Sequence, residues 1–263
     1  MVWSRVILFV IMEGIIINST EMNRRAWLDH QRRIAEEQED TIYAPILDVY
    51  WGAIDPLHEQ FYIRFLSLCP PEGLILDAAC GTGRFWPLIL ASGREVFGVD
   101  QSQGMLARAH AKFPQASYEK VGLQEMNYRE AFDGASCMDA MESIPPEDWP
   151  IVLSNFHRAV KPGSYFYFTV ETTSEEILQE AYADAQQAGL PTVYGEWAYE
   201  GGYHGDWAQA GGYHYYPKMG QVREWLEQAG FHLIDEAEGE EYHHFLAQKK
   251  HLIKPQIDPD SHR

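Results

Sequence analysis

The chain has 263 residues, is 46% hydrophobic and carries a formal net charge of -19. A chain of this length buries one substantial core, so we expect one main domain with appended segments. The net charge argues against nucleic acid as a partner, because affinity for phosphates depends on clustered Lys and Arg. We interpret the acidity mainly as a solvated surface, with a preference for a cationic substrate as the less favoured explanation.

Residues 1–21 contain an apolar run, Val6 to Met12, that is too short to span a bilayer. Glu13 interrupts the apolar stretch, and no Ala-x-Ala cleavage site follows, which argues against a signal peptide. We therefore expect a tail or an extended translation start here, and no membrane partner. Whether the natural protein contains these residues stays open.

The three cysteines show neither disulfide spacing nor the spacing of metal ligands. Two of them, Cys80 and Cys137, fall in apolar strand ends, where a small buried thiol fits well. The sequence therefore predicts a reducing, cytoplasmic location and no metal site.

The predicted elements begin with an N-terminal helical lid over residues 22–54, whose first helix covers residues 23–40. A helix over 56–68 then leads to a Pro- and Gly-rich stop. From residue 74 strands and helices alternate with short links, which indicates a mostly parallel sheet covered by helices on both faces. The predicted strands are 74–77, 94–100, 116–121, 134–139 and 164–170, and the predicted helices are 84–91, 103–112 and 147–160.

The last part of the chain contains an insertion, residues 172–219, with a helix over 174–187 and a glycine-aromatic tract. In this tract Gly201-Gly-Tyr-His204 recurs as Gly211-Gly-Tyr-His214, which predicts a local hairpin. A helix over 221–229 and a hairpin of two strands, 231–237 and 242–249, complete the domain. Residues 251–263 are expected to form a C-terminal tail.

A glycine-rich turn follows the first strand and is the most informative feature of the sequence. Gly81 and Gly83 allow a sharp turn after Leu76, and a helix follows, so a ligand can approach the backbone closely. The second strand ends on Asp100, where a carboxylate can accept hydrogen bonds from both hydroxyls of a ribose. The sequence therefore predicts a nucleoside ligand.

A dinucleotide is disfavoured at this turn. The dinucleotide fingerprint needs a third glycine three positions after Gly83, and Trp86 stands there. Asp77, at the end of the strand, would also direct negative charge toward a pyrophosphate. An NAD-dependent oxidoreductase is thus the weaker interpretation.

The pattern Asp77-x-Ala79-x-Gly81-x-Gly83, followed by Gly98-Val-Asp100, resembles motifs I and II of the class I S-adenosylmethionine-dependent methyltransferases. The family usually has glycine at the position of Ala79. The resemblance covers residues 55–250 and implies an α/β fold with a doubly wound, seven-stranded sheet of order 3-2-1-4-5-7-6, in which the last strand is antiparallel. It also implies S-adenosyl-L-methionine as the cofactor. The cofactor-binding residues that it implies are Asp77, Cys80, Gly81, Gly83, Asp100, Gln101, Met105, Leu123, Gln124, Cys137 and Met138.

Two histidines of the insertion, His204 and His214, are the candidate catalytic residues. Histidine titrates near neutrality and suits a general base, and the surrounding aromatic rings can exclude water from a substrate. The alternative is that the rings form the underside of a cap and His214 has a structural role. Asp139 and Glu142, just after the fourth strand, can contact substrate, although Glu142 can equally hydrogen-bond the loop that follows.

Together these features predict methyl transfer to a small-molecule acceptor by in-line displacement, a reaction in which most of the catalysis can come from positioning. A non-catalytic protein that only binds the cofactor remains an alternative. The acceptor atom, the metabolite and the oligomeric state stay open, with a homodimer as one option.

Overall fold

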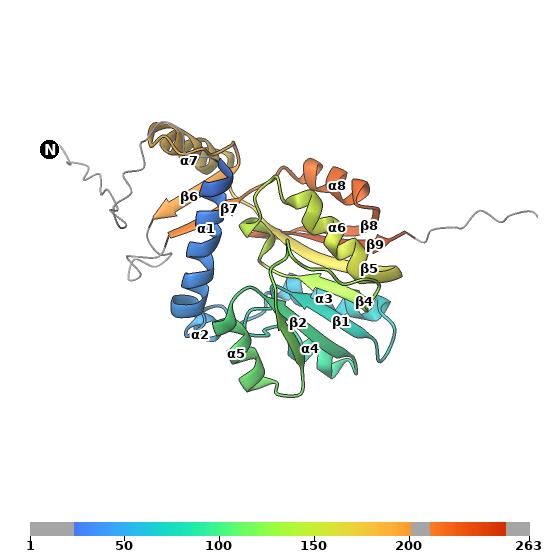
Figure 1. Ribbon diagram of the computed structural model, residues 1–263. Coiled ribbons are helices and arrows are strands. Elements are labelled where there is room, and N and C mark those ends of the chain that lie inside the picture. Colours follow the sequence, from blue (N-terminus) through green and yellow to red (C-terminus); the bar gives the residue numbers. More distant parts are fainter. Residues whose placement is uncertain (1–23, 201–210, 251–263) are drawn as a thin grey trace, which may run out of the picture.

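Seven strands form one mixed sheet in the computed structural model, which describes residues 24–200 and 211–250 (Figure 1). The strands are β1 (Leu74–Ala78), β2 (Glu95–Asp100), β3 (Ser117–Lys120), β4 (Phe132–Cys137), β5 (Val160–Glu171), β8 (Phe231–Glu238) and β9 (Tyr242–Lys249). Their order is β3-β2-β1-β4-β5-β9-β8, and β9 runs antiparallel to both of its neighbours. The predicted fold class and strand order are confirmed, with β9 as the antiparallel strand between β5 and β8.

Helices cover both faces of the sheet because the strands carry apolar residues on both sides. One face packs against α3 (Pro56–Leu68), α4 (Trp86–Ala91) and α5 (Gln103–Lys112), with Tyr62, Trp86 and Leu106 in a shared core. The other face packs against α6 (Trp149–Ala159) and α8 (Met219–Gln228), with Trp149 and Phe166 fully buried. The prediction of helices on both faces is therefore confirmed.

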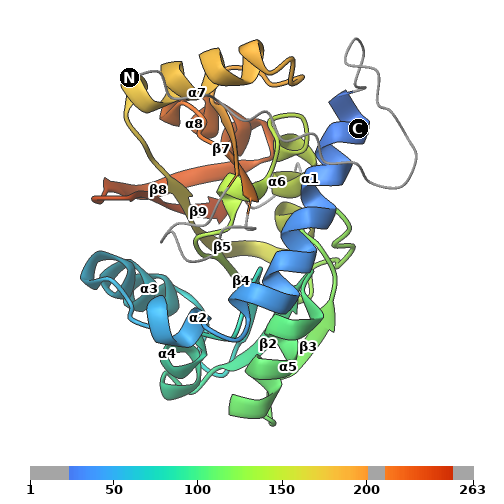
Figure 2. The same cartoon turned by 90° about the vertical axis from the view of Figure 1, so that its left-hand side faces the viewer.

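The N-terminal segment crosses the edge of the sheet at which the parallel strands end. It consists of α1 (Arg24–Gln38), a π-helix η1 (Glu39–Tyr43) and the short α2 (Leu47–Tyr50). In two views α1 extends from β7 to the region of α2 and α5 (Figures 1 and 2). At the lower end, Asp40 accepts hydrogen bonds from Ser102 Oγ at 2.6 Å and from Gly104 N at 2.7 Å, which fixes η1 to the start of α5.

The insertion folds into α7 (Glu175–Gln187) and a separate two-stranded sheet, the cap hairpin, made of β6 (Glu196–Glu200) and β7 (Gly211–Tyr215). The predicted hairpin is present, but the strand opposite Gly211–His214 is β6, so Trp197 pairs with His214. The first Gly-Gly-Tyr-His copy, including His204, lies outside the described residues.

Arg24 joins the start of α1 to the cap hairpin. Its guanidinium donates two hydrogen bonds to Glu196, at 2.7 and 2.9 Å, and also pairs with Glu147. Tyr213 Oη donates to the same Glu196 at 2.5 Å. Glu196 is fully buried, so this pairing is protected from solvent competition.

Several predicted boundaries are wrong by a few residues. The helix expected from residue 84 begins at Trp86, and β4 ends at Cys137 rather than at 139. The early end of β4 has a backbone cause, since Asp139 has a φ of +50° and cannot continue a strand. Strand β5 starts at Val160 because the Lys-Pro-Gly segment, expected as a stop, is included through a register shift opposite Phe132 and Gly134. Within residues 24–200 and 211–250, no helix is long and apolar enough to cross a membrane.

Candidate cofactor and acceptor site

The turn after β1 has the backbone conformation that its glycines predict. Gly81 and Gly83 have φ values of +53° and +78°, in the left-handed region that glycine tolerates. Ala79 shares this region with a φ of +53°, which explains why glycine is the usual residue there. The turn is held by Gly81 N, which donates to Asp100 Oδ2 at 2.8 Å.

Trp86 lies under the turn and packs against the second strand. A Cβ atom at position 98 would lie 2.3 Å from Trp86 Cζ2, so Gly98 is what allows the indole to fit. The indole Nε1 donates to Asp77 Oδ2 at 3.0 Å, and Ser136 Oγ donates to Asp77 Oδ1 at 2.7 Å. Burial raises the pKa of Asp77 to about 6 despite these two hydrogen bonds. The residue that replaces the third glycine therefore orients the first acidic residue of the motif.

Asp100 sits at the end of β2, as predicted, and anchors two loops. Its Oδ1 accepts from Ser102 N at 2.8 Å, while its Oδ2 accepts from the turn. Burial raises the pKa of Asp100 to about 6, and the two backbone donors counteract that rise. The carboxylate is thus held rigidly at the strand end.

A hollow lies at this strand end. Four of the predicted cofactor residues line it: Asp100, Gln101, Leu123 and Gln124. The other predicted residues lie around the turn or in the core beside it, namely Asp77, Cys80, Gly81, Gly83, Met105, Cys137 and Met138. The remaining lining residues are Arg32, Ala35, Glu39, Ala79, Val121, Gly122, Ala140, Ser143 and Ile144.

Glu39, from the π-helix η1, also lines the hollow, and the sequence analysis missed it. Its Oε2 accepts from Gln101 Nε2 at 3.1 Å. Burial, followed by the charge of Asp100, raises the pKa of Glu39 to about 8. The acidic run at the end of the first helix was the available signal, but it did not indicate which carboxylate turns inward.

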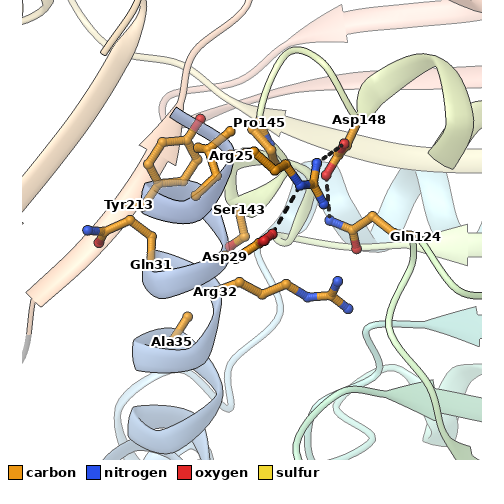
Figure 3. Close-up of a pocket in the computed structure, with 11 residues that line it drawn as sticks. Arg25, Asp29, Gln31, Arg32, Ala35, Gln124, Ser143, Pro145, Asp148 and Tyr213 are labelled. Carbon is orange, nitrogen blue, oxygen red and sulfur yellow. Dashed lines mark hydrogen bonds and ion pairs between the residues drawn. The ribbon is translucent and has the colours of Figure 1, made fainter. Parts of the chain in front are cut away.

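A second hollow of about 400 Å³ adjoins the first beneath α1, and the two share Arg32, Ala35, Gln124 and Ser143 as lining residues. Figure 3 shows a polar network along its wall, centred on Arg25 and Asp148. Arg25 Nη1 donates to Asp148 Oδ1 at 2.9 Å, and Gln124 Nε2 lies 3.4 Å from Asp148 Oδ2. Helix α1 therefore forms one wall of a continuous recess.

The end of β4 carries a buried ionic cluster. Asp139 Oδ1 lies 2.9 Å from His58 Nε2, and its Oδ2 pairs with Arg84. Burial acts to raise the pKa of Asp139, but the hydrogen bond from His58 and the charge of Arg84 outweigh it and lower the pKa to about 2. Asp139 is thus compensated by its own neighbours.

Beyond this cluster, Glu171 and His214 meet, and the 3-10 helix that carries Glu142 packs against the strands of both. Glu142 lies on the 3-10 helix η2 (Met141–Ser143), Glu171 ends β5, and His214 comes from β7. His214 Nδ1 lies 2.7 Å from Glu171 Oε2 and 3.2 Å from Tyr216 Oη. The structure therefore brings one of the two predicted histidines to the ends of β4 and β5.

Comparison with known proteins agrees with this arrangement. Residues 75–163 match a family described as "Methyltransferase domain". A protein of Synechocystis sp., described as an uncharacterized methyltransferase, is 32% identical over 41% of this chain and 50% of its own length. The ubiquinone biosynthesis O-methyltransferase of Methylococcus capsulatus is 25% identical over 44% of this chain and 50% of its own. The chain thus spans about half the length of these curated relatives.

Solved structures show the same fold at low sequence identity. A methyltransferase structure from Methanosarcina mazei aligns with a TM-score of 0.60 at 16% identity, covering 75% of this chain and 99% of that one. Magnesium protoporphyrin IX methyltransferase from Synechocystis, solved with bound S-adenosylmethionine, aligns with a TM-score of 0.58 at 15% identity, covering 84% and 97%. The fold is that of the class I methyltransferases. Residues 75–163 of this chain thus match a methyltransferase domain, within a fold shared with S-adenosylmethionine-dependent methyltransferases.

Proposed function

We propose that the protein binds S-adenosyl-L-methionine in the hollow at the end of β2 and transfers its methyl group to a small-molecule acceptor. The observation that carries this proposal is the position of Asp100, a rigid buried carboxylate that lies beside a glycine turn and lines a hollow. When bound, the cofactor would supply a methyl group activated by its sulfonium. The residues around the hollow fit this ligand, because they offer carboxylates and amides, and Arg32, the cation among the described lining residues, is paired with Glu125.

The hollow suggests a division of roles among its lining residues. Asp100 would accept the ribose hydroxyls, and Gln101 and Gln124 would contact the adenine from two sides. Leu123 would supply an apolar surface for the ring. Asp77, engaged by Trp86 and Ser136, would act as a fixed negative charge behind the methionine end.

We assign the role of general base to His214. It lies beside Glu171 at the end of β5, and imidazole is the side chain best suited to proton transfer at neutral pH. His204, in the first copy of the repeat, remains a second candidate. The acceptor is proposed to be small rather than a nucleic acid because of the net charge of -19.

The test is calorimetric titration of the full chain with S-adenosylhomocysteine and, separately, with NAD⁺. We expect saturable binding of the first ligand and none of the second. Tight binding of NAD⁺ without binding of S-adenosylhomocysteine would favour the oxidoreductase alternative. Binding of the cofactor without methyl transfer to any member of a broad acceptor library would favour a non-catalytic role.

The three free and buried cysteines, Cys69, Cys80 and Cys137, suit a reducing compartment, so we propose a cytoplasmic location. A homodimer is the oligomeric state we would test first, by light scattering of the purified chain.

A further inference from the structure

Glu142 is a buried carboxylate without a compensating cation. Its side chain is 5% exposed, and its Oε2 has no hydrogen-bond partner among the residues that the structure describes. Such a group destabilises the folded protein unless it holds a proton or receives a partner. Burial, and next the charge of Glu171, raise the pKa of Glu142 well above its usual range.

The neighbouring charges do not neutralise Glu142. Arg84 is the cation that acts on it, but that guanidinium already pairs with Asp139 and donates to the Trp51 carbonyl at 3.0 Å. His214 Nδ1 lies 2.7 Å from Glu171 Oε2, but without hydrogen-bond geometry, since that oxygen has no hydrogen-bond partner among the described residues. The Glu171 carboxylate therefore repels negative charge on Glu142. Among the described residues, the negative charges of this region exceed the positive charges that pair with them.

Glu142 lies next to the part of the recess in which we propose that the methyl acceptor binds. Residues on both sides of it, Ala140 and Ser143, line the hollow at the end of β2. The 3-10 helix η2, which carries Glu142, packs against β5 and β7, so the charge of Glu171 at the end of β5 acts on the Glu142 carboxyl. Tyr242 pairs with Glu171 in the sheet register, and the charge of Glu142 contributes to the raised pKa of its phenol.

From this arrangement we infer that Glu142 and Glu171 form a receptor for a cationic nitrogen, so that the methyl acceptor is an amine that enters as an ammonium ion. It would give one N–H proton to His214, the proposed base, before its lone pair attacks the methyl group and the S–C bond breaks. An ammonium group would supply Glu142 with the opposite charge and the hydrogen-bond donor that its described neighbours do not provide. The ring of Tyr242 adds an aromatic surface of the kind that attracts cations. A carboxylate acceptor would be repelled by the same pair. This inference rests on the proposed cofactor function.

The first experiment uses a cation anchored by the cofactor site. Sinefungin carries an amine at the position of the transferred methyl group, whereas S-adenosylhomocysteine is neutral there. Calorimetry should show sinefungin binding at least tenfold more tightly to the wild-type chain, and Glu142→Gln should abolish this preference. Glu176→Gln, an exposed carboxylate on α7, is the matched control and should keep it. An equal preference in wild type and Glu142→Gln, or none in wild type, overturns the receptor.

The second experiment tests whether the acceptor brings the cation. The protein saturated with S-adenosylhomocysteine is titrated with benzylamine, benzyl alcohol and benzoate, which share one ring, with ligand-observed NMR as the readout. The amine should bind at least tenfold more tightly than the other two, and only in chains that keep Glu142. If the three probes behave alike, or the difference survives Glu142→Gln, the amine assignment is wrong even where sinefungin is preferred.

Two controls separate the possible failures. Absence of S-adenosylhomocysteine binding to the wild-type chain would contradict the proposed function itself, not the amine receptor. Thermal unfolding of Glu142→Gln should show no loss of stability, because the amide keeps the shape of the side chain and, like a protonated carboxyl, carries no charge.

Discussion

The cofactor half and the acceptor half of the recess differ in how their carboxylates are satisfied. At the ends of β1 and β2, Asp77 and Asp100 each accept two hydrogen bonds from fixed protein donors. At the ends of β4 and β5, Glu142 lacks a partner for one oxygen within the described part of the chain. The comparison indicates that the cofactor half is largely organised before binding, whereas the acceptor half depends on its ligand for compensation.

The largest expected effect concerns the acceptor half. With an acceptor found by screening amines against methyl-labelled cofactor, His214→Ala should reduce turnover by about a hundredfold or more, since general base catalysis contributes on that scale. Affinity for S-adenosylhomocysteine should stay near wild type, and a parallel fall in that affinity would show that the two halves are not separable at His214.

The cofactor half should respond to Asp100→Ala. We expect affinity for S-adenosylhomocysteine to fall by roughly 1.5–3 kcal/mol, the scale for loss of charge-assisted hydrogen bonds. Asp184→Ala, on the exposed face of α7, is the control and should bind normally. Unchanged calorimetric affinity in a folded Asp100→Ala chain would remove this carboxylate from the ribose.

Glu39 lines the cofactor half, and its raised pKa should make the affinity for the cofactor depend on pH. Because its pKa is raised to about 8, Glu39 is protonated at neutral pH in the free protein. The raised pKa stabilises the fold at low pH, and this contribution is lost as the pH rises toward 8.

The ionised form of Glu39 would hold a hydroxyl or amino donor of the nucleoside more strongly than the protonated form, because the hydrogen bond is then charge-assisted. Affinity for S-adenosylhomocysteine should therefore rise from pH 7 to pH 9 by up to about tenfold. Calorimetry in buffers of different ionisation enthalpy should detect proton release on binding. Glu39→Gln should remove both effects and Glu37→Gln, at an exposed position, should leave them; a pH-independent wild type would contradict the prediction.

The smallest effect concerns the conformation of the cofactor turn. Ala79 has a positive φ, which costs about 1–2 kcal/mol, partly offset by the entropy that glycine loses on folding. Ala79→Gly should therefore increase the free energy of unfolding by about 0.5–1 kcal/mol in urea denaturation. Ala183→Gly, in the exposed middle of α7, should do the opposite. Destabilisation by both would show that the turn does not hold position 79 in the left-handed conformation.

The sequence predicted the cofactor half well because its features are local. The glycine turn and Asp100 lie at the ends of two consecutive strands, and parallel strands bring such ends to one edge. The strand order was implied by the family resemblance. The limits of β4 and β5 depended on the φ of Asp139 and on a register shift, neither of which a sequence pattern predicts.

The acceptor half was less predictable because it is assembled from distant segments. Glu142, Glu171 and His214 meet only through the packing of β7 against η2 and β5. Sequence reasoning proposed His214 as a base but did not indicate its pairing with Glu171. The inward turn of Glu39 likewise depends on a π-helix, whose extra residue per turn shifts the face on which a side chain lies.

The Arg24 pairing with buried Glu196 has a kinetic consequence. It fastens α1, a wall of both hollows, to the cap hairpin at the acceptor side. Because Glu196 is fully buried, moving α1 away from the cap hairpin would leave its charge buried without a partner or expose it to solvent. We therefore expect α1 and the cap hairpin to open together, so that release of the spent cofactor and release of the methylated product would share a single gate and a single rate.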